Sequence, residues 1–165
     1  VSALFRLFRL YEVNYEVLQE DLVSVIIPTK NGYDDLKLCI DSIIEKTTYS
    51  NYEIIVADNG STDPKMQELF KEYQQRLNER FIVELIDIPF NYSRINNLAA
   101  EKASGKYLLF LNNDTEVIEP EWMTNMVAYA QFDLSPCKRS SAAIHGVFRR
   151  ARPRGESMDA HVSRE

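Results

Sequence analysis

The chain has 165 residues, of which 45% are hydrophobic and 27% charged, and it carries a net charge of −6. This length allows one domain with a substantial core, and the composition is that of a globular protein. It contains no apolar run near the roughly 20 residues that a membrane-spanning helix needs. We expect no signal peptide and no general binding to nucleic acid, which relies on neutralising many phosphates.

The two cysteines, Cys39 and Cys137, have neither the spacing of a metal site nor the number needed for a disulfide framework. Cys39 lies on the apolar side of a predicted helix, which favours a reduced thiol in the core. Because thiols stay reduced in the cytosol, we expect a cytoplasmic protein.

The middle of the chain alternates between short apolar runs and amphipathic segments. Residues 23–27 are rich in β-branched side chains, as in a strand that is buried on both faces. Further strands are predicted at 54–57, 81–86 and 107–111, and helices at 34–46, at 64–80 and from Ser93 onward. Strands separated by helices of this length imply right-handed crossovers. The pattern therefore predicts an α/β fold with a mostly parallel sheet flanked by helices.

Individual residues mark the boundaries of these helices. Asp63 and Pro64 predict a helix start, because aspartate caps the first turn and proline suits its first position. Ser93 predicts the cap of the following helix, and Gly105 predicts its C-terminal stop. Trp122 is predicted to lie in the core.

The N-terminal end differs from this middle. Residues 3–19 place apolar side chains around two arginines in a pattern that predicts a helix, packed on this domain or on a neighbouring one. The alternative is a helix that lies on a membrane surface or binds a partner. We therefore assign residues 1–21 to an N-terminal helical extension, with peripheral membrane association left open.

The C-terminal end also differs. From about residue 132 no strand or helix periodicity remains, and Arg, Ser and Pro are frequent, as in a disordered segment. We predict that residues 132–165 form a disordered basic tail, with a basic arm for anionic lipid or RNA as the alternative. This change in pattern and the first residue, Val1, predict a fragment of a longer protein, in which residues 22–131 form a partial domain.

Polar residues follow each predicted strand at the point where it stops. They occupy residues 28–31, 58–63, 89–92 and 112–114. In an open parallel sheet, ligands bind in the crevice outside the carboxyl ends of the strands. The four clusters therefore predict one shared binding site.

The residues at these ends suit a nucleotide bound through a cation. The chain has neither a G-x-G-x-x-G motif nor a P-loop, so no glycine-rich loop is predicted to hold phosphate. Asp58 and Asp114 stand at strand ends instead, and carboxylates repel phosphates unless a divalent cation lies between them. Mg²⁺ and Mn²⁺ prefer carboxylate and phosphate oxygens, so we predict that one of them is a cofactor.

Three ordered motifs stand at these strand ends. They are S-V-I-I-P-T-K-N at 24–31, I-V-A-D-N-G-S-T-D at 55–63 and G-K-Y-L-L-F-L-N-N-D at 105–114. In this order and at these separations they resemble family 2 glycosyltransferases, over residues 22–130. The resemblance implies a GT-A fold, Rossmann-like and here incomplete on its C-terminal side. It also implies inverting transfer of a sugar from a nucleotide-diphospho-sugar to a saccharide or lipid-linked acceptor, in polysaccharide biosynthesis.

The same resemblance implies roles for particular residues. Asp58 hydrogen-bonds the base, and Asp114 is the metal ligand of the family's D-x-D element, in which Asn112 replaces the first acid. The carbonyl oxygen of Asn112 can still ligate a metal or accept a hydrogen bond from ribose, but it carries no charge, so metal affinity should be lower. The other predicted nucleotide-sugar-binding residues are Pro28, Thr29, Asn31, Asn91, Asn97 and Asn113.

Several of these residues also suit a purely structural role. Asp58 and Asp114 are typical turn residues at strand ends, and Asn31 precedes a glycine, as in a turn. Either Asn96 or Asn97 approaches the nucleotide or caps the adjacent loop, and the sequence does not separate the two.

The catalytic residues stay unknown at this stage. Inverting transfer needs a general base, which in the family is an acid on a segment after the D-x-D element. The acids and histidines of the tail lie in no predicted strand or helix; they are Asp133, Glu156, Asp159, His145 and His161. The alternative function is therefore a catalytically inactive, truncated fragment that at most binds nucleotide. A nucleotidyltransferase is a weaker alternative, because no glycine-rich loop follows the first strand.

Overall fold

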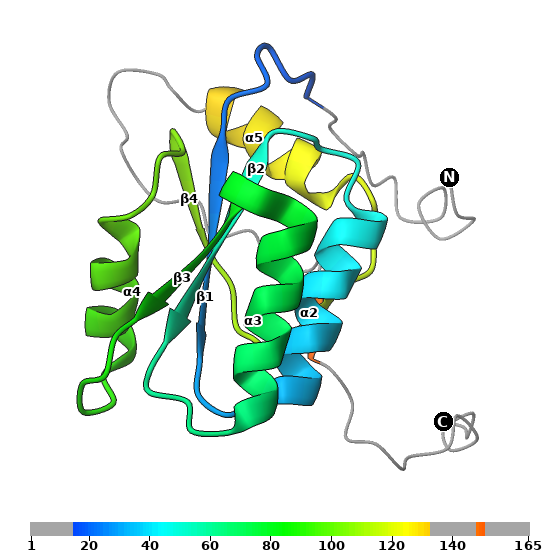
Figure 1. The fold of residues 1–165 in the computed structure, drawn as a ribbon. Helices are drawn as coiled ribbons and strands as arrows, with labels where there is room; N and C mark the ends of the chain where they lie inside the picture. The colour runs from blue at the N-terminus through cyan, green and yellow to red at the C-terminus, as the bar shows by residue number, and fades with distance from the viewer. Residues whose placement is uncertain (1–14, 133–147, 151–165) are drawn as a thin grey trace, which may run out of the picture.

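The computed structural model describes residues 15–132 and 148–150. Its centre is a four-stranded parallel sheet in the order β3-β2-β1-β4. These strands are β1 (Val23–Thr29), β2 (Tyr52–Asp58), β3 (Phe81–Leu85) and β4 (Tyr107–Phe110). The connecting helices are α2 (Tyr33–Lys46), α3 (Pro64–Leu77), the short 3-10 helix η1 (Asn78–Arg80), α4 (Tyr92–Ala100) and α5 (Trp122–Phe132). The predicted α/β fold with a parallel sheet is confirmed (Figure 1).

Helices cover both faces of this sheet, with α2 and α3 on one side and α4 on the other (Figure 1). Val25 and Ile27 of β1 pack into the cluster that includes α2, α3 and α5. Ile26 joins the cluster beneath α4. Successive strand residues point to opposite faces, so β1 needs apolar side chains on both, which explains its near-continuous hydrophobic sequence.

Trp122 lies in the core, as predicted, and fixes α5 to it. Its side chain is fully buried, and the indole Nε1 donates a hydrogen bond to Thr47 Oγ1 at 2.9 Å. A buried tryptophan thus satisfies its one polar group while its ring fills the space beside α2.

Two predicted boundaries of α4 are wrong. The helix is capped by Asn91, whose side chain accepts a hydrogen bond from the Arg94 amide at 3.0 Å, and not by Ser93. Both residue types cap helices, and the sequence offers both within one turn. Gly105 does not stop α4, which ends earlier; it packs against β1, where a Cβ would lie 2.6 Å from the Ser24 backbone nitrogen.

The predicted N-terminal helix is wrong over residues 15–19, which form no helix; the rest of it lies outside the described residues. The Tyr15 ring stacks on Phe132 at 4.3 Å between centroids. The Leu18 amide donates to Gln131 Oε1 at 2.7 Å, and Gln131 Nε2 donates to the Gln19 carbonyl at 2.6 Å. Backbone groups that a helix would pair internally are satisfied by an α5 side chain instead.

Little of the predicted disordered tail falls within the described residues. Residues 148–150 form β6 (Phe148–Arg150), which pairs antiparallel with β5 (Thr115–Val117) in a small second sheet. The prediction that this stretch lacks secondary structure is wrong, because the backbone of β5 offers hydrogen-bonding groups to a second strand. Cys137 and the tail's acids and histidines lie outside the described residues.

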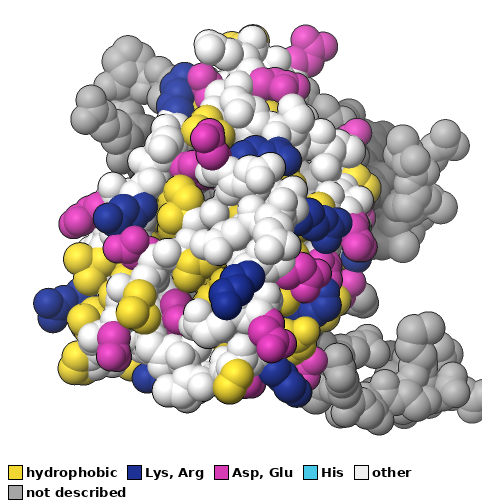
Figure 2. Space-filling view, viewed as in Figure 1, with side chains coloured by type: hydrophobic (Ala, Val, Ile, Leu, Met, Phe, Trp, Pro, Cys, Tyr) yellow, Lys and Arg dark blue, Asp and Glu magenta, His cyan; other side chains and the backbone are white. Residues whose placement is uncertain are grey.

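Two further observations concern the charges on the surface and the length and apolar character of the helices. Basic and acidic side chains are mixed over the face seen in Figure 2. Within residues 15–132 and 148–150, no helix has the length and apolar character that crossing a membrane requires.

Replacing Trp122 with alanine should lower the free energy of unfolding by about 3–5 kcal/mol, because the change leaves a cavity in the core. Urea unfolding followed by circular dichroism measures this. The control is Leu85→Ala, at a side chain that is 67% exposed, where a change of at most about 0.5 kcal/mol is expected. Equal losses in the two variants would contradict the assigned role of Trp122.

Candidate functional site

The carboxyl ends of the parallel strands lie at one edge of the sheet, at the bottom of the view in Figure 1. Thr29 is in register with Asp58, and Asp58 with Leu85. Backbone hydrogen bonds continue past the strands: the Asn59 amide donates to the Thr29 carbonyl at 2.9 Å, and the Ile86 amide to the Asp58 carbonyl at 2.8 Å. The segments that leave the first three strands are therefore held together.

Asn31 links the loop after β1 to the loop after β2. Its Oδ1 accepts hydrogen bonds from the amides of Thr62 at 2.7 Å and Asp63 at 3.0 Å, and its own amide donates to Ser61 Oγ at 2.9 Å. Its φ of 53° is the left-handed conformation that asparagine tolerates. The chain bends at residues 30–31, where a turn was expected, and Asn31 holds the loops after β1 and β2 together.

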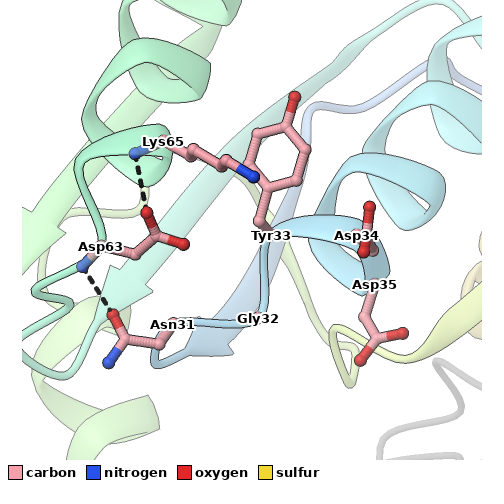
Figure 3. Close-up of a pocket in the computed structure, with 7 residues that line it drawn as sticks. All are labelled: Asn31, Gly32, Tyr33, Asp34, Asp35, Asp63 and Lys65. Carbon is pink, nitrogen blue, oxygen red and sulfur yellow. Dashed lines mark hydrogen bonds between the residues drawn. The ribbon is translucent and has the colours of Figure 1, made fainter.

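An open hollow of about 300 Å³ lies beside Asn31, between the starts of α2 and α3 (Figure 3). Asp63 caps α3 as predicted, with Oδ1 accepting from the Lys65 amide at 3.0 Å. The side chains that line the hollow include more acids than bases. An anion would therefore be repelled there unless a cation lay between it and the carboxylates. The lining comprises Asn31, Gly32, Tyr33, Asp34, Asp35, Asp63 and Lys65.

Asp58 is buried at the end of β2. Its exposed fraction is 2%, and Oδ1 accepts a hydrogen bond from the Ser61 amide at 2.9 Å. The structural interpretation of Asp58 as a turn residue is therefore realised. A carboxylate has two oxygens and several acceptor positions, so this contact leaves capacity for a ligand.

Asn59 contributes a contact that the sequence analysis missed. Its Nδ2 donates to the carbonyls of Ile86 and Ile88, each at 2.8 Å, which holds the segment after β3 against the end of β2. Gly60 makes the turn beyond it with a φ of 77°, and a Cβ there would lie 2.7 Å from Asp87 Oδ1. The Asn-Gly pair after a strand is the available sequence signal, and it indicates only a turn.

The segment after β4 contacts both the end of β1 and the start of α4. Asn113 Nδ2 donates to Thr29 Oγ1 at 3.2 Å, which ties it to the end of β1. Tyr92 Oη, at the start of α4, donates to Asn112 Oδ1 at 3.3 Å; Tyr92 belongs to the polar cluster predicted at residues 89–92, but no individual role was expected of it. Asp114 is half-buried in the turn before β5. The structure therefore brings Thr29, Asn112 and Asn113 together, with Asp114 adjacent in the chain.

The remaining predicted residues lie on β1 and α4. Pro28 is in β1 opposite Ala57, and Asn91 is exposed as the cap of α4. Asn96 is buried, and its Nδ2 donates to the Tyr92 carbonyl at 2.9 Å. Asn97 is exposed on α4, so of this pair Asn97 is the one accessible to a ligand.

Asp114 and Asn112 suit a cation whose remaining ligands come from a substrate and from water. Within the part of the chain that the structure describes, no three His, Cys, Asp or Glu side chains gather as a metal site would require. Asp114 and Asn112 supply one carboxylate and one amide oxygen. Mg²⁺ is commonly held by one or two carboxylates, with phosphate oxygens and waters completing its shell. These residues fit such an ion and do not form a closed protein cage.

Cys39 lies directly beneath this segment. It is fully buried and unpaired with another cysteine, and its Sγ donates to the Asn112 carbonyl at 3.8 Å and lies 3.6 Å from Thr115 Oγ1. Burial raises the pKa of the thiol from 9.0 to about 11, and the hydrogen bonds with Thr115 oppose this rise. The predicted core position of Cys39 is confirmed, and its thiol forms no disulfide within the described residues.

Comparison with known proteins identifies the sequence relatives. The model of one protein family, described as Glycosyl transferase family 2, matches residues 24–152. The chain is 42% identical over 121 residues to the O-antigen biosynthesis protein RfbC of Myxococcus xanthus, and 32% identical over 110 residues to the glycosyltransferase GlyA of Streptococcus pneumoniae. The matches cover 73% and 67% of this chain but only 9% and 15% of those relatives.

Solved structures show the same fold. The mannosyltransferase PcManGT of Pyrobaculum calidifontis, in complex with GDP-Man and Mn²⁺, matches with a TM-score of 0.64 and 19% identity, over 76% of this chain and 38% of that one. GalNAc-T7 with UDP, GalNAc and Mn²⁺ matches with a TM-score of 0.62 and 26% identity, over 68% and 21%. The first likeness shows the fold alone. The expected fold class is confirmed by both.

Asn31→Ala should lower the free energy of unfolding by about 1–3 kcal/mol, because it leaves the Thr62 and Asp63 amides without their acceptor. Asn31→Asp keeps an oxygen for both amides and should cost less. Thermal unfolding at matched concentration compares the two. A larger loss for Asn31→Asp would contradict the bridging role of this side chain.

In a Cys137→Ser background, Cys39 should resist a thiol reagent at pH 8 in the native protein and react fully in urea, because burial keeps it protonated and inaccessible. The folded state binds this proton more tightly, so the stability from Cys39 should fall as pH rises from about 9 to about 11. Rapid labelling of the native protein at pH 8 would contradict this account.

Proposed function

This chain belongs to glycosyl transferase family 2, and we propose that residues 22–131 bind a nucleotide-diphospho-sugar together with a divalent cation. In this proposal the domain is the donor-binding part of an enzyme that transfers the sugar with inversion to an acceptor hydroxyl. The observation that carries it is the contact of Asn113 with Thr29. It joins the third motif to the first at the edge where α/β folds bind ligands.

The donor class is supported by charge and by structural neighbours. Asp58 ends β2 and Asp114 follows β4 at this edge, and three further acids line the hollow at the starts of α2 and α3, so a diphosphate bound at the edge would need a cation. Two neighbours of this fold contain GDP-Man or UDP together with Mn²⁺. We propose the same class of donor for this chain.

Each residue of the edge has a place in this proposal. Asp58, with one oxygen already held by Ser61, accepts a hydrogen bond from the base. Asn112 and Asp114 hold Mg²⁺ or Mn²⁺, which would offset the charge of the departing diphosphate. The other residues proposed to line the nucleotide-sugar are Pro28, Thr29, Asn31, Asn91, Asn97 and Asn113.

For the acceptor we propose only a chemical class, and for the general base no residue. Similarity to a protein named for O-antigen biosynthesis supports a saccharide or lipid-linked acceptor in polysaccharide assembly. A reduced, buried Cys39 suits the cytoplasm, and a lipid-linked acceptor would bring the enzyme to a membrane surface. We assign no general base among residues 15–132.

Calorimetric titration of UDP, GDP and dTDP, with Mn²⁺ and then with EDTA, tests the site. Asp114→Ala should weaken cation-dependent binding by at least about tenfold, since even changes beyond the direct ligands cost 10- to 100-fold in metal sites. Asn112→Asp should strengthen Mn²⁺ binding, because a second carboxylate raises the ligand charge.

The control for this titration is Glu68→Ala, at an exposed carboxylate of α3, which should bind as the unaltered chain does. Binding that persists in EDTA or in Asp114→Ala would contradict the cation's role. If the folded chain bound none of the three nucleotides, the donor-site proposal itself would be wrong.

A further inference from the structure

Two buried polar side chains interrupt the apolar centre of the sheet. Ser24 of β1 is fully buried and Glu53 of β2 is 6% exposed, and the two are directly in register. They lie near the amino ends of their strands, away from the edge that carries the donor site. On β1 and β2 they share a face with Ile26 and Ile55, which pack beneath α4.

These side chains hold the segment that enters β4. Ser24 Oγ donates to Glu53 Oε1 at 2.6 Å, and the Ser104 amide donates to the same oxygen at 2.7 Å. The Gly105 amide donates to Ser24 Oγ at 2.8 Å. Two consecutive amides just before β4 are thus bound by side chains of two different strands.

Gly105 makes this approach possible. A Cβ at that position would lie 2.5 Å from Ser24 Oγ and 2.9 Å from the Leu22 carbonyl oxygen. Only a residue without a side chain lets the backbone come this close. The glycine, the serine and the glutamate therefore form one fitted contact.

A carboxylate in this position is costly unless it is well hydrogen-bonded. Burial of an unpaired charge is strongly unfavourable, whereas short hydrogen bonds to an ionised oxygen are roughly twice as strong as neutral ones. An apolar side chain would fill the same space without this demand. The contact therefore specifies one arrangement of the β4 entry, which is the best-attested use of buried polar groups.

The register of β4 on β1 needs a contact that specifies it. Among the described residues β4 is an edge strand of four residues that pairs with β1 alone, from Val23↔Tyr107 to Ile26↔Phe110. A one-residue slip would exchange its two faces and shift the following segment by about 3.3 Å along the strand. That shift would break the contact between Asn113 and Thr29.

We propose that Glu53 is a positioning residue for the donor site. Its buried carboxylate, acting with Ser24, fixes the register of β4 on β1 and thereby sets where Asn112 and Asp114 stand at the far end of the strand. This inference rests on the proposed function for its effect on ligand binding. The register itself does not depend on that function.

The test compares Glu53→Ala, Glu53→Gln and Ser24→Ala in the full chain. Tyr73→Phe is the matched control, because Tyr73 is fully buried, its Oη donates to Asp41 at 2.9 Å, and it lies on α3. Each variant is assayed for hydrogen exchange of the β4 amides relative to β2, and for UDP affinity with Mn²⁺ where folded.

Glu53→Ala should raise β4 exchange and weaken UDP·Mn²⁺ binding by about tenfold or more, since changes behind the direct ligands of a metal site cost about 10- to 100-fold in metal affinity. Glu53→Gln keeps an acceptor oxygen and should fall between it and the unaltered chain. Tyr73→Phe should change neither quantity, whatever it does to overall stability. If Glu53→Ala does not fold, Ser24→Ala, which removes only the Gly105 acceptor and one donor to Glu53, should show the same selective change.

The inference is overturned if β4 exchange in these variants rises no more than in Tyr73→Phe, or if β4 loosens while nucleotide affinity stays unchanged. Should the unaltered chain bind no nucleotide, the proposed function fails. The exchange measurement then still decides whether Glu53 holds the register of β4.

Discussion

The structure depends on one constraint, the parallel alignment of strands that are buried on both faces. This alignment forces an apolar sequence on β1 and β2, and it requires a helix or long connection to return the chain before each next strand. It also collects the carboxyl ends of the strands at one edge. The hydrogen bonds that Asn31 accepts and Asn59 donates, together with the Asn113 contact with Thr29, then join the loops into one surface. The candidate site is a direct result of this topology.

The same constraint explains what could be predicted from sequence. Buried strands give a strong sequence signal, so the sheet could be predicted, and with it the edge at which the parallel strands end. The cap of α4 was misassigned to Ser93, because Asn91 competes for the same role only two residues away. The clamp made by Asn59 and the Tyr92 contact with Asn112 depend on the distance between segments far apart in the chain. The spacing of residues along the sequence does not show how close such segments lie in space.

Polar groups divide into two sets at opposite ends of the strands. At the carboxyl ends, Asn112 is exposed and Asp114 is half-buried, so a ligand can reach both. At the amino ends, Glu53 and Ser24 are buried and engaged with the backbone before β4. The first set suits chemistry and the second suits register. The chain spans only a small part of its relatives, such as 9% of RfbC.

The most direct test of this account is paramagnetic mapping of the folded chain by nuclear magnetic resonance. Mn²⁺ is added at low stoichiometry with UDP, and the loss of amide signals is followed residue by residue. The account predicts loss centred on Asp114 and extending to Thr29 and the segment after Asp58, while amides near Glu53 stay sharp. Signal loss centred elsewhere, or loss that UDP does not alter, would contradict the claim that the strand ends form a cation-bridged donor site.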